Sequence, residues 1–74
     1  MVKHYSQDYG KSRVYWITIN DKVVEFSLEQ RNDSLYMDIL DEPDLETWEA
    51  AAFQEELKRC IIEYKSHLLK YLWN

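Results

Sequence analysis

The 74-residue sequence carries a net charge of −5, and 46% of its residues are apolar, which is enough for a packed core. The acidity argues against direct binding to nucleic acid or to an anionic membrane, since cations dominate recognition of both. One cysteine excludes an internal disulfide and a cysteine-based zinc site. No apolar run is long enough to span a bilayer and no apolar signal segment opens the chain, so a cytoplasmic location is expected.

The first twelve residues hold the only glycine of the chain, Gly10, and mix polar side chains with Tyr5 and Tyr9. We interpret this segment as a flexible arm, with an edge strand as the alternative. A chain of this length supports one hydrophobic core, so residues 1–74 are expected to form a single small domain.

A β-hairpin is predicted next, with strands at residues 13–19 and 22–28 that are rich in β-branched and aromatic side chains. Asn20 and Asp21 lie between the strands, and both tolerate the positive φ of a two-residue turn. This turn sets the register, which pairs Ile19 with Lys22, Ile17 with Val24, and Tyr15 with Phe26. One face then collects the expected core: Tyr15, Ile17, Ile19, Val24, Phe26 and Leu28.

Residues 34–40 alternate in side-chain character and are predicted to form a third strand. Consecutive strands with short loops favour an antiparallel meander. The face turned away from the core is unusually apolar for a solvated surface, because it carries Val14, Trp16, Val23, Tyr36 and Leu40.

Residues 44–72 contain neither proline nor glycine and are predicted to form one long amphipathic helix, capped by Asp41 or Asp44. Helical spacing places one broad apolar stripe against the sheet: Phe53, Leu57, Cys60, Ile61, Tyr64, Leu68 and Tyr71. A second apolar line lies on the opposite side: Trp48, Ala51, Ile62, Leu69 and Trp73.

The fold class expected is α+β, a three-stranded antiparallel β-meander followed by one long C-terminal α-helix packed on one sheet face (β-β-β-α). A helix of about 43 Å would overhang strands of about 20–23 Å. We therefore expect either a break near residues 64–67 or a partner that covers the overhang.

No motif for catalysis or cofactor binding is found. His4 and His67 are the only histidines and lack a third ligand at metal spacing, so no metal site is expected. Cys60 falls on the core stripe, where a buried, inert thiol is the usual state. A chain with one glycine has no phosphate-binding loop. We therefore expect neither enzymatic activity nor a cofactor.

An acidic block lies between Asn32 and Leu57, where nine carboxylates occur without a lysine or arginine. Helix capping and solubility explain part of it. The alternative is a negative patch that docks on a basic surface.

Our leading hypothesis is a non-catalytic, acidic binding protein that inhibits or modulates a basic, nucleic-acid-handling partner protein by occupying its groove in place of phosphates. The proposed partner-binding residues combine carboxylates with aromatic anchors: Asp38, Asp41, Glu42, Asp44, Glu46, Glu49, Trp16 and Trp48. In size, acidity and lack of catalytic motifs the chain resembles phage-encoded anti-defence inhibitors, including DNA-mimic anti-restriction and anti-CRISPR proteins. This resemblance is one of composition, and no motif accompanies it.

The alternative hypothesis is a homodimeric structural or accessory subunit. Its copies would associate through the outer line of the C-terminal helix, at Ile62, Leu69 and Trp73.

Overall fold

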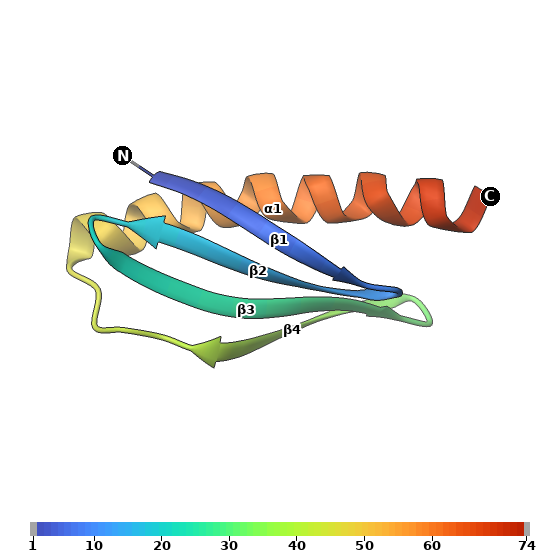
Figure 1. Ribbon diagram of the computed structural model, residues 1–74, viewed down its shortest axis with the longest axis horizontal. Helices are drawn as coiled ribbons and strands as arrows, with labels where there is room; N and C mark the ends of the chain where they lie inside the picture. Colours follow the sequence, from blue (N-terminus) through green and yellow to red (C-terminus); the bar gives the residue numbers. More distant parts are fainter. Residues whose placement is uncertain (1, 74) are drawn as a thin grey trace.

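The computed structural model describes residues 2–73, and the side chains of residues 2–70. Its elements in chain order are β1 (Val2–Tyr9), β2 (Ser12–Ile19), β3 (Lys22–Arg31), β4 (Ser34–Asp41) and α1 (Thr47–Trp73). The strands form one antiparallel sheet in the order β1-β2-β3-β4, and α1 lies along one face of it (Figure 1). The α+β class is confirmed, but the sheet has four strands rather than the three predicted.

The additional strand is β1, so residues 1–12 contain the edge strand given as the alternative and are not a flexible arm. Val2 to Tyr9 pair with β2 along their whole length. Gly10 has a φ of 74°, a left-handed conformation that suits glycine at the turn into β2. The strand is not evident from the sequence because polar residues occupy its inward positions. The side chains of His4 and Ser6 face the helix side and form hydrogen bonds there.

The central hairpin is confirmed in turn and register. Asn20 and Asp21 have φ values of 47° and 68°, as a primed two-residue turn requires. The predicted cross-strand pairs are all present. Each predicted core residue of β2 and β3 is at most 1% exposed, and Tyr15 and Phe26 stack with ring centroids 5.5 Å apart. Phe53 of α1 meets the ring of Phe26 edge-on at 6.0 Å, which joins the helix to the sheet.

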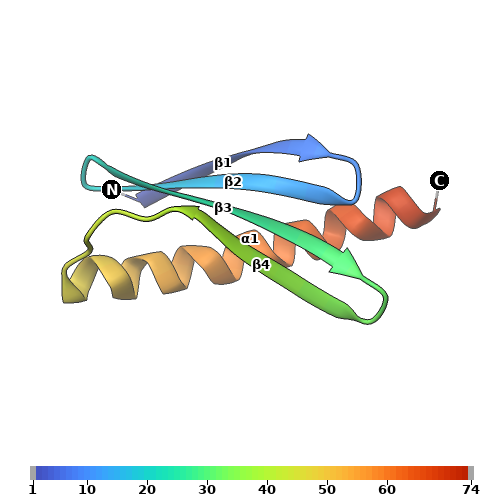
Figure 2. The same ribbon diagram turned by 90° about the horizontal axis from the view of Figure 1, so that it is seen from below.

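The β4 strand lies at the edge of the sheet and extends to Asp41, one residue beyond the prediction. Its register shifts near Leu40, because Phe26 pairs with Ile39 while Glu25 pairs with Asp41. Such a bulge bends the strand and increases its twist. Figure 2 shows the β1–β2 and β3–β4 hairpins splaying apart toward the turns at their far ends.

The helix begins at Thr47, three residues later than predicted, and the predicted caps Asp41 and Asp44 do not cap it. Glu46 takes the cap position instead: its carbonyl oxygen accepts a hydrogen bond from the Ala50 amide at 2.8 Å. The Glu49 carboxylate accepts the Glu46 amide at 2.8 Å, as in a capping box. The side chain of Glu49, the third residue of the helix, therefore accepts the amide of the cap residue Glu46, a role that neither Asp41 nor Asp44 fills.

The helix is continuous through residues 64–67. Its 27 residues span about 40 Å, against about 26–34 Å for strands of 8–10 residues. The overhang is smaller than predicted because the strands are longer, although the last helical turns reach past the hairpin turns (Figure 1). The predicted packing stripe is confirmed for the side chains that the structure describes, and its buried members are Phe53, Leu57, Cys60, Tyr64 and Leu68. Ile61 is partly buried against this core, and the side chain of Tyr71 lies outside the described residues.

Tyr64 connects the helix to both hairpins at the end where their turns lie. Its side chain is fully buried, and its hydroxyl donates to the carbonyl oxygen of Lys11 and accepts the Gln30 amide at 2.8 Å. The hydroxyl of Tyr15 is also buried, but among the described residues it has no hydrogen-bond partner. Two buried tyrosines thus differ in whether the hydroxyl group is satisfied.

Tyr64→Phe should lower the free energy of unfolding by about 1–3 kcal/mol, because a buried amide and a carbonyl lose their partner. Tyr15→Phe is the matched control, and it should leave stability unchanged or raise it, because it removes an unsatisfied group from the core. Urea denaturation followed by circular dichroism measures both. Equal losses for the two variants would contradict this assignment.

Candidate binding surface

The carboxylates of the acidic block fall into two groups, those with a partner in the protein and those without one. Two members of the first group, Glu49 and Glu56, are also buried. Glu49 is 1% exposed. Its carboxylate lies 2.7 Å from Lys22 Nζ and 3.4 Å from Asn20 Nδ2. The hydrogen bond from Lys22, helped by the Glu46 amide, holds the pKa of Glu49 below its usual range. Glu49 therefore anchors the helix start to the β2–β3 turn, and its carboxylate is not free to meet a partner.

Glu56 is the second buried carboxylate, at 6% exposure. It lies 2.6 Å from His4 Nδ1 and 2.7 Å from Arg59, and the hydrogen bond from His4 lowers the pKa of Glu56. Glu63 takes the other ring nitrogen of His4, at 2.9 Å. Burial lowers the pKa of His4, but hydrogen bonds to the two carboxylates outweigh this effect and raise it overall. The His4 imidazolium thus joins β1 to two turns of α1.

Two further acids of the block have local partners at the surface. The Glu46 carboxylate accepts the indole N–H of Trp48 at 3.0 Å, and Trp48 remains 55% exposed. Glu55 lies 3.4 Å from Lys58, one helical turn away. Glu46 and Trp48, both predicted to bind a partner, therefore lie together at the start of α1.

The second group is unpaired. Its carboxylates are exposed, and no cation among the side chains of residues 2–70 forms an ion pair with them. They lie on the β3–β4 turn, on β4 and on the segment that leads to α1: Asp33, Asp38, Asp41, Glu42 and Asp44. Lys22 reaches this segment at the main-chain oxygen of Asp44, at 2.8 Å, and gives its charge to Glu49. Asp38, Asp41, Glu42 and Asp44 thus follow one another along β4 and the segment after it without an ion-pair partner, and together with Asp33 we call them the acidic edge.

The acidic edge continues onto the face of the sheet turned away from α1. Across this face, one row of paired residues runs from Tyr5 through Trp16 and Glu25 to Asp41. Trp16 stacks on Tyr5 with ring centroids 5.2 Å apart. Glu25 and Asp41 are like charges in paired positions, an arrangement that is unfavourable without a cation. The predicted anchor Trp16 therefore shares a row with the predicted acid Asp41.

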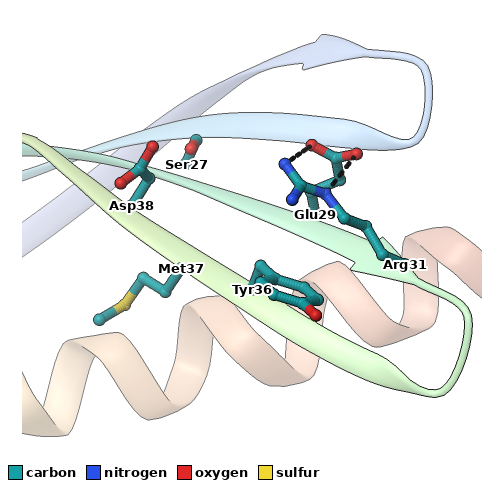
Figure 3. A pocket seen from close by; sticks show the side chains of 6 residues that line it. All are labelled: Ser27, Glu29, Arg31, Tyr36, Met37 and Asp38. Atoms are coloured by element: carbon teal, nitrogen blue, oxygen red, sulfur yellow. Dashed lines mark hydrogen bonds and ion pairs between the residues drawn. The ribbon is translucent and has the colours of Figure 1, made fainter.

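A shallow hollow lies between β3 and β4 on the same side of the sheet, lined by Ser27, Glu29, Arg31, Tyr36, Met37 and Asp38 (Figure 3). The Arg31 guanidinium contacts Glu29 at 3.2 and 3.4 Å and lies 4.8 Å from the centre of the Tyr36 ring. This cation is held by Glu29 of its own strand and by the Tyr36 ring of β4, and it forms no ion pair with Asp38.

Sequence reasoning did not identify Tyr5, Glu25 or Arg31 as parts of this surface. The alternation of residues 2–9 could have placed Tyr5 beside Trp16, had the segment been predicted as a paired strand. Strand alternation places Glu25 on the face away from the core, but its opposition to Asp41 depends on the bulge at Leu40. A bulge shifts pairing by one residue and leaves no clear pattern in a single sequence.

The remaining chemical candidates are structural. Burial raises the pKa of the Cys60 thiol to about 12, so the nucleophilic thiolate is suppressed at neutral pH. Over the part of the chain that the structure describes, no group of three or more histidine, cysteine, aspartate or glutamate residues is arranged to hold a metal ion. His67 contacts Asp8 at 3.2 Å across to β1.

The outer line of α1 is exposed where it is described. Ile62 is 67% and Leu69 59% exposed, and both lie on the side of the helix away from the sheet. The side chain of Trp73, predicted to belong to the same line, lies outside the described residues.

The His4 cluster predicts a pH optimum of stability. The pKa of His4 is raised above 6.5, so its stabilisation is full below that value and is lost as the pH rises through the folded-state pKa. The pKa of Glu56 is lowered from 4.5, so its stabilisation is present above that value and is lost as the pH falls through the folded-state pKa. The free energy of unfolding should therefore be greatest between pH 4.5 and pH 6.5, and it should decline at higher pH.

His4→Gln should flatten this decline over the range above pH 6.5, because the folded-state pKa of His4 lies above that value. Urea denaturation across that range measures the slope. His67→Gln leaves the His4 cluster intact and is the control, in which the contribution of His4 to the decline should persist. A wild-type slope in His4→Gln would rule out this origin.

Across residues 2–73, no helix has the length and apolarity needed to cross a membrane. Comparison with protein-family models, with curated proteins and with solved structures gives no match. The geometry of the surface is therefore the basis for the proposal that follows.

Proposed function

We propose that this chain is a non-catalytic binding protein that inhibits or modulates a partner with a basic surface, of the kind that handles nucleic acid. The observation that supports this proposal is the division of the acidic block. Glu49 and Glu56 are neutralised within the fold, whereas the acidic edge is left exposed and unpaired. Stability alone does not require carboxylates in this second state.

The acidic edge would act first on association. Carboxylates without an ion-pair partner attract a cationic surface over distances of about 10 Å, the range that screening by ordinary salt allows. A groove that binds phosphates presents such a surface, and carboxylates can take the place of phosphates in it. Binding there would exclude nucleic acid and inhibit the partner. The phage-encoded anti-restriction and anti-CRISPR proteins that the composition resembles are inhibitors of this class.

Aromatic side chains would supply the contacts that persist after association. Trp16 and Tyr5 form a stacked pair at the other end of the row that contains Asp41. Trp48 is exposed beside the segment that carries Glu42 and Asp44. Tryptophan and tyrosine are enriched among residues that dominate interface energies. Trp48 thus follows the acidic edge closely in the chain, whereas the Tyr5–Trp16 pair lies at the opposite end of a row that reaches it.

Capture of partners from a nuclease-treated lysate at low and high salt tests the proposal. A basic protein should be retained at low salt and released at high salt, because the attraction is screened. With that partner in hand, Glu42→Lys and Asp44→Lys together should slow association about tenfold with little change in dissociation.

The matched control is Glu55→Lys with Lys58→Glu, which exchanges an exposed helical pair without changing the acidic edge or the net charge. Its association rate should equal that of the wild type. Binding that is indifferent to salt, or equally slow in the control, would refute the electrostatic part of the proposal.

A second candidate function is self-association as a homodimeric accessory subunit. The exposure of Trp48, Ile62 and Leu69 on one side of α1 favours it, because their spacing is in multiples of seven. The line is interrupted by Glu55, which weakens such a seam. This hypothesis concerns a different surface from the acidic edge.

If the helices pair in this way, Ile62→Glu should shift the protein from dimer to monomer in sedimentation equilibrium, because it buries a charge in the seam. Lys65→Glu, on an exposed part of the helix outside this line, is the control and should leave the dimer intact. A dimer that survives Ile62→Glu, or a wild-type monomer, would eliminate this function.

A further inference from the structure

The two edges of the sheet differ in how they are covered. At the β1 edge, Val2 packs against the core and His4 is held by Glu56 and Glu63 of the helix. At the β4 edge Leu35 also packs partly against the core, but no hydrogen bond or ion pair joins β4 to α1 among the described side chains, and β4 is the strand that lies furthest from α1 (Figure 1). The helix packs mainly over β1 and β2, so the edge of β4 is open to a further strand.

The helix-side face of β4 extends the core without being buried. Leu35 packs partly against the core, whereas Met37 is 46% and Ile39 39% exposed. These side chains alternate along the strand, so they present an apolar row to whatever lies beside β4. A strand paired with residues 34–39 would bring its own alternate side chains onto this row.

The opposite face of β4 carries charge. Asp38 lies opposite Ser27, and Asp41 lies opposite Glu25, without a cation in ion-pair contact among the described residues. A neighbouring strand would therefore meet apolar side chains on one face and carboxylates on the other. Its favoured sequence would alternate aliphatic with basic residues.

A second copy of this chain does not fit that pattern. Two β4 strands paired edge to edge would bring the carboxylates of both copies onto adjoining strands, including Asp38 and Asp41. Like charges on neighbouring strands are unfavourable, and charged residues on edges commonly prevent self-pairing. The same carboxylates that oppose a second copy would attract a basic strand.

We propose that β4 is a docking edge for an extended segment of the partner protein, in which lysine or arginine alternates with aliphatic residues. The segment adds a fifth strand beside residues 34–39, with main-chain hydrogen bonds to the outer edge of β4. Its aliphatic side chains cover Met37 and Ile39, and a basic side chain faces Asp38, with Asp41 just beyond the paired stretch. This inference rests on the proposed function, because it specifies how the basic partner is held.

The probe for this inference is a synthetic eight-residue peptide in which lysine alternates with valine. Two peptides of equal length are controls, one with its lysines and valines in separate blocks and one with glutamate in place of lysine. Amide NMR spectra and hydrogen exchange of the full-length protein are recorded with each. The alternating peptide should perturb β4 amides selectively and slow the exchange of β4 amides at least tenfold, because outward amides gain hydrogen bonds.

Two variants and a control locate the contact. Met37→Lys should weaken binding at least tenfold by placing a cation on the apolar row, and Asp38→Lys should do so by removing the opposite charge. Gln54→Lys adds the same charge as Met37→Lys at an exposed position of the helix and should bind as the wild type. All three positions are exposed, so the fold should tolerate the changes.

The outcomes separate the inference from the proposed function. Salt-sensitive binding of both basic peptides without exchange protection in β4 would overturn strand addition and keep electrostatic docking. Equal β4 protection by the glutamate peptide would overturn the proposed charge preference while keeping the open edge. Absence of binding by either basic peptide would overturn the inference, whereas capture of a basic protein through the acidic edge would still support the proposed function.

Discussion

A single helix cannot cover four strands, and much of the molecule follows from this limit. A helix is about 10 Å wide, whereas the axes of four adjacent strands span about 14 Å. On the β1 side, polar contacts hold α1 to the sheet, because His4 of β1 lies between Glu56 and Glu63 of the helix. Because the helix is held over β1 and β2, β4 is left at the margin with exposed apolar side chains.

The same arrangement explains why the acidic block does not behave as one feature. Carboxylates on the side of α1 that faces the sheet pair with cations of the sheet: Glu49 pairs with Lys22, and Glu56 pairs with His4. Carboxylates on β4 and on the connection to the helix have no packed element above them, and they remain solvated. The position of a carboxylate relative to α1, more than its place in the sequence, decides whether it is paired within the protein or available to a partner.

Much of this arrangement is predictable from the sequence, and the exceptions have physical causes. The Asn20–Asp21 turn and the alternation on both sides of it determine the hairpin register, because a slip by one residue would exchange the two faces. Helical spacing identifies the buried stripe from Phe53 to Leu68, because apolar residues that recur every three or four positions fall on one face of the helix. These are local patterns, and each is repeated several times along the chain.

The missed features depend on contacts between distant residues. β1 contains few β-branched residues, and its pairing is supported by side chains of α1 that lie more than fifty positions away. The burial of Glu49 depends on Lys22 at the start of β3, and the row that joins Trp16 to Asp41 depends on a bulge. Composition could indicate that an acidic surface exists, but not which carboxylates belong to it.

The His4 contacts also bear on the order in which the protein is made. The strands form a meander of neighbouring hairpins, so each can pair with the next as it leaves the ribosome. The partners of His4 are 52 and 59 residues further along, and the apolar face of the sheet has no cover until α1 has been synthesised. During that interval the nascent sheet exposes Tyr15, Ile17 and Phe26, and a chaperone that binds extended apolar segments would find its target there.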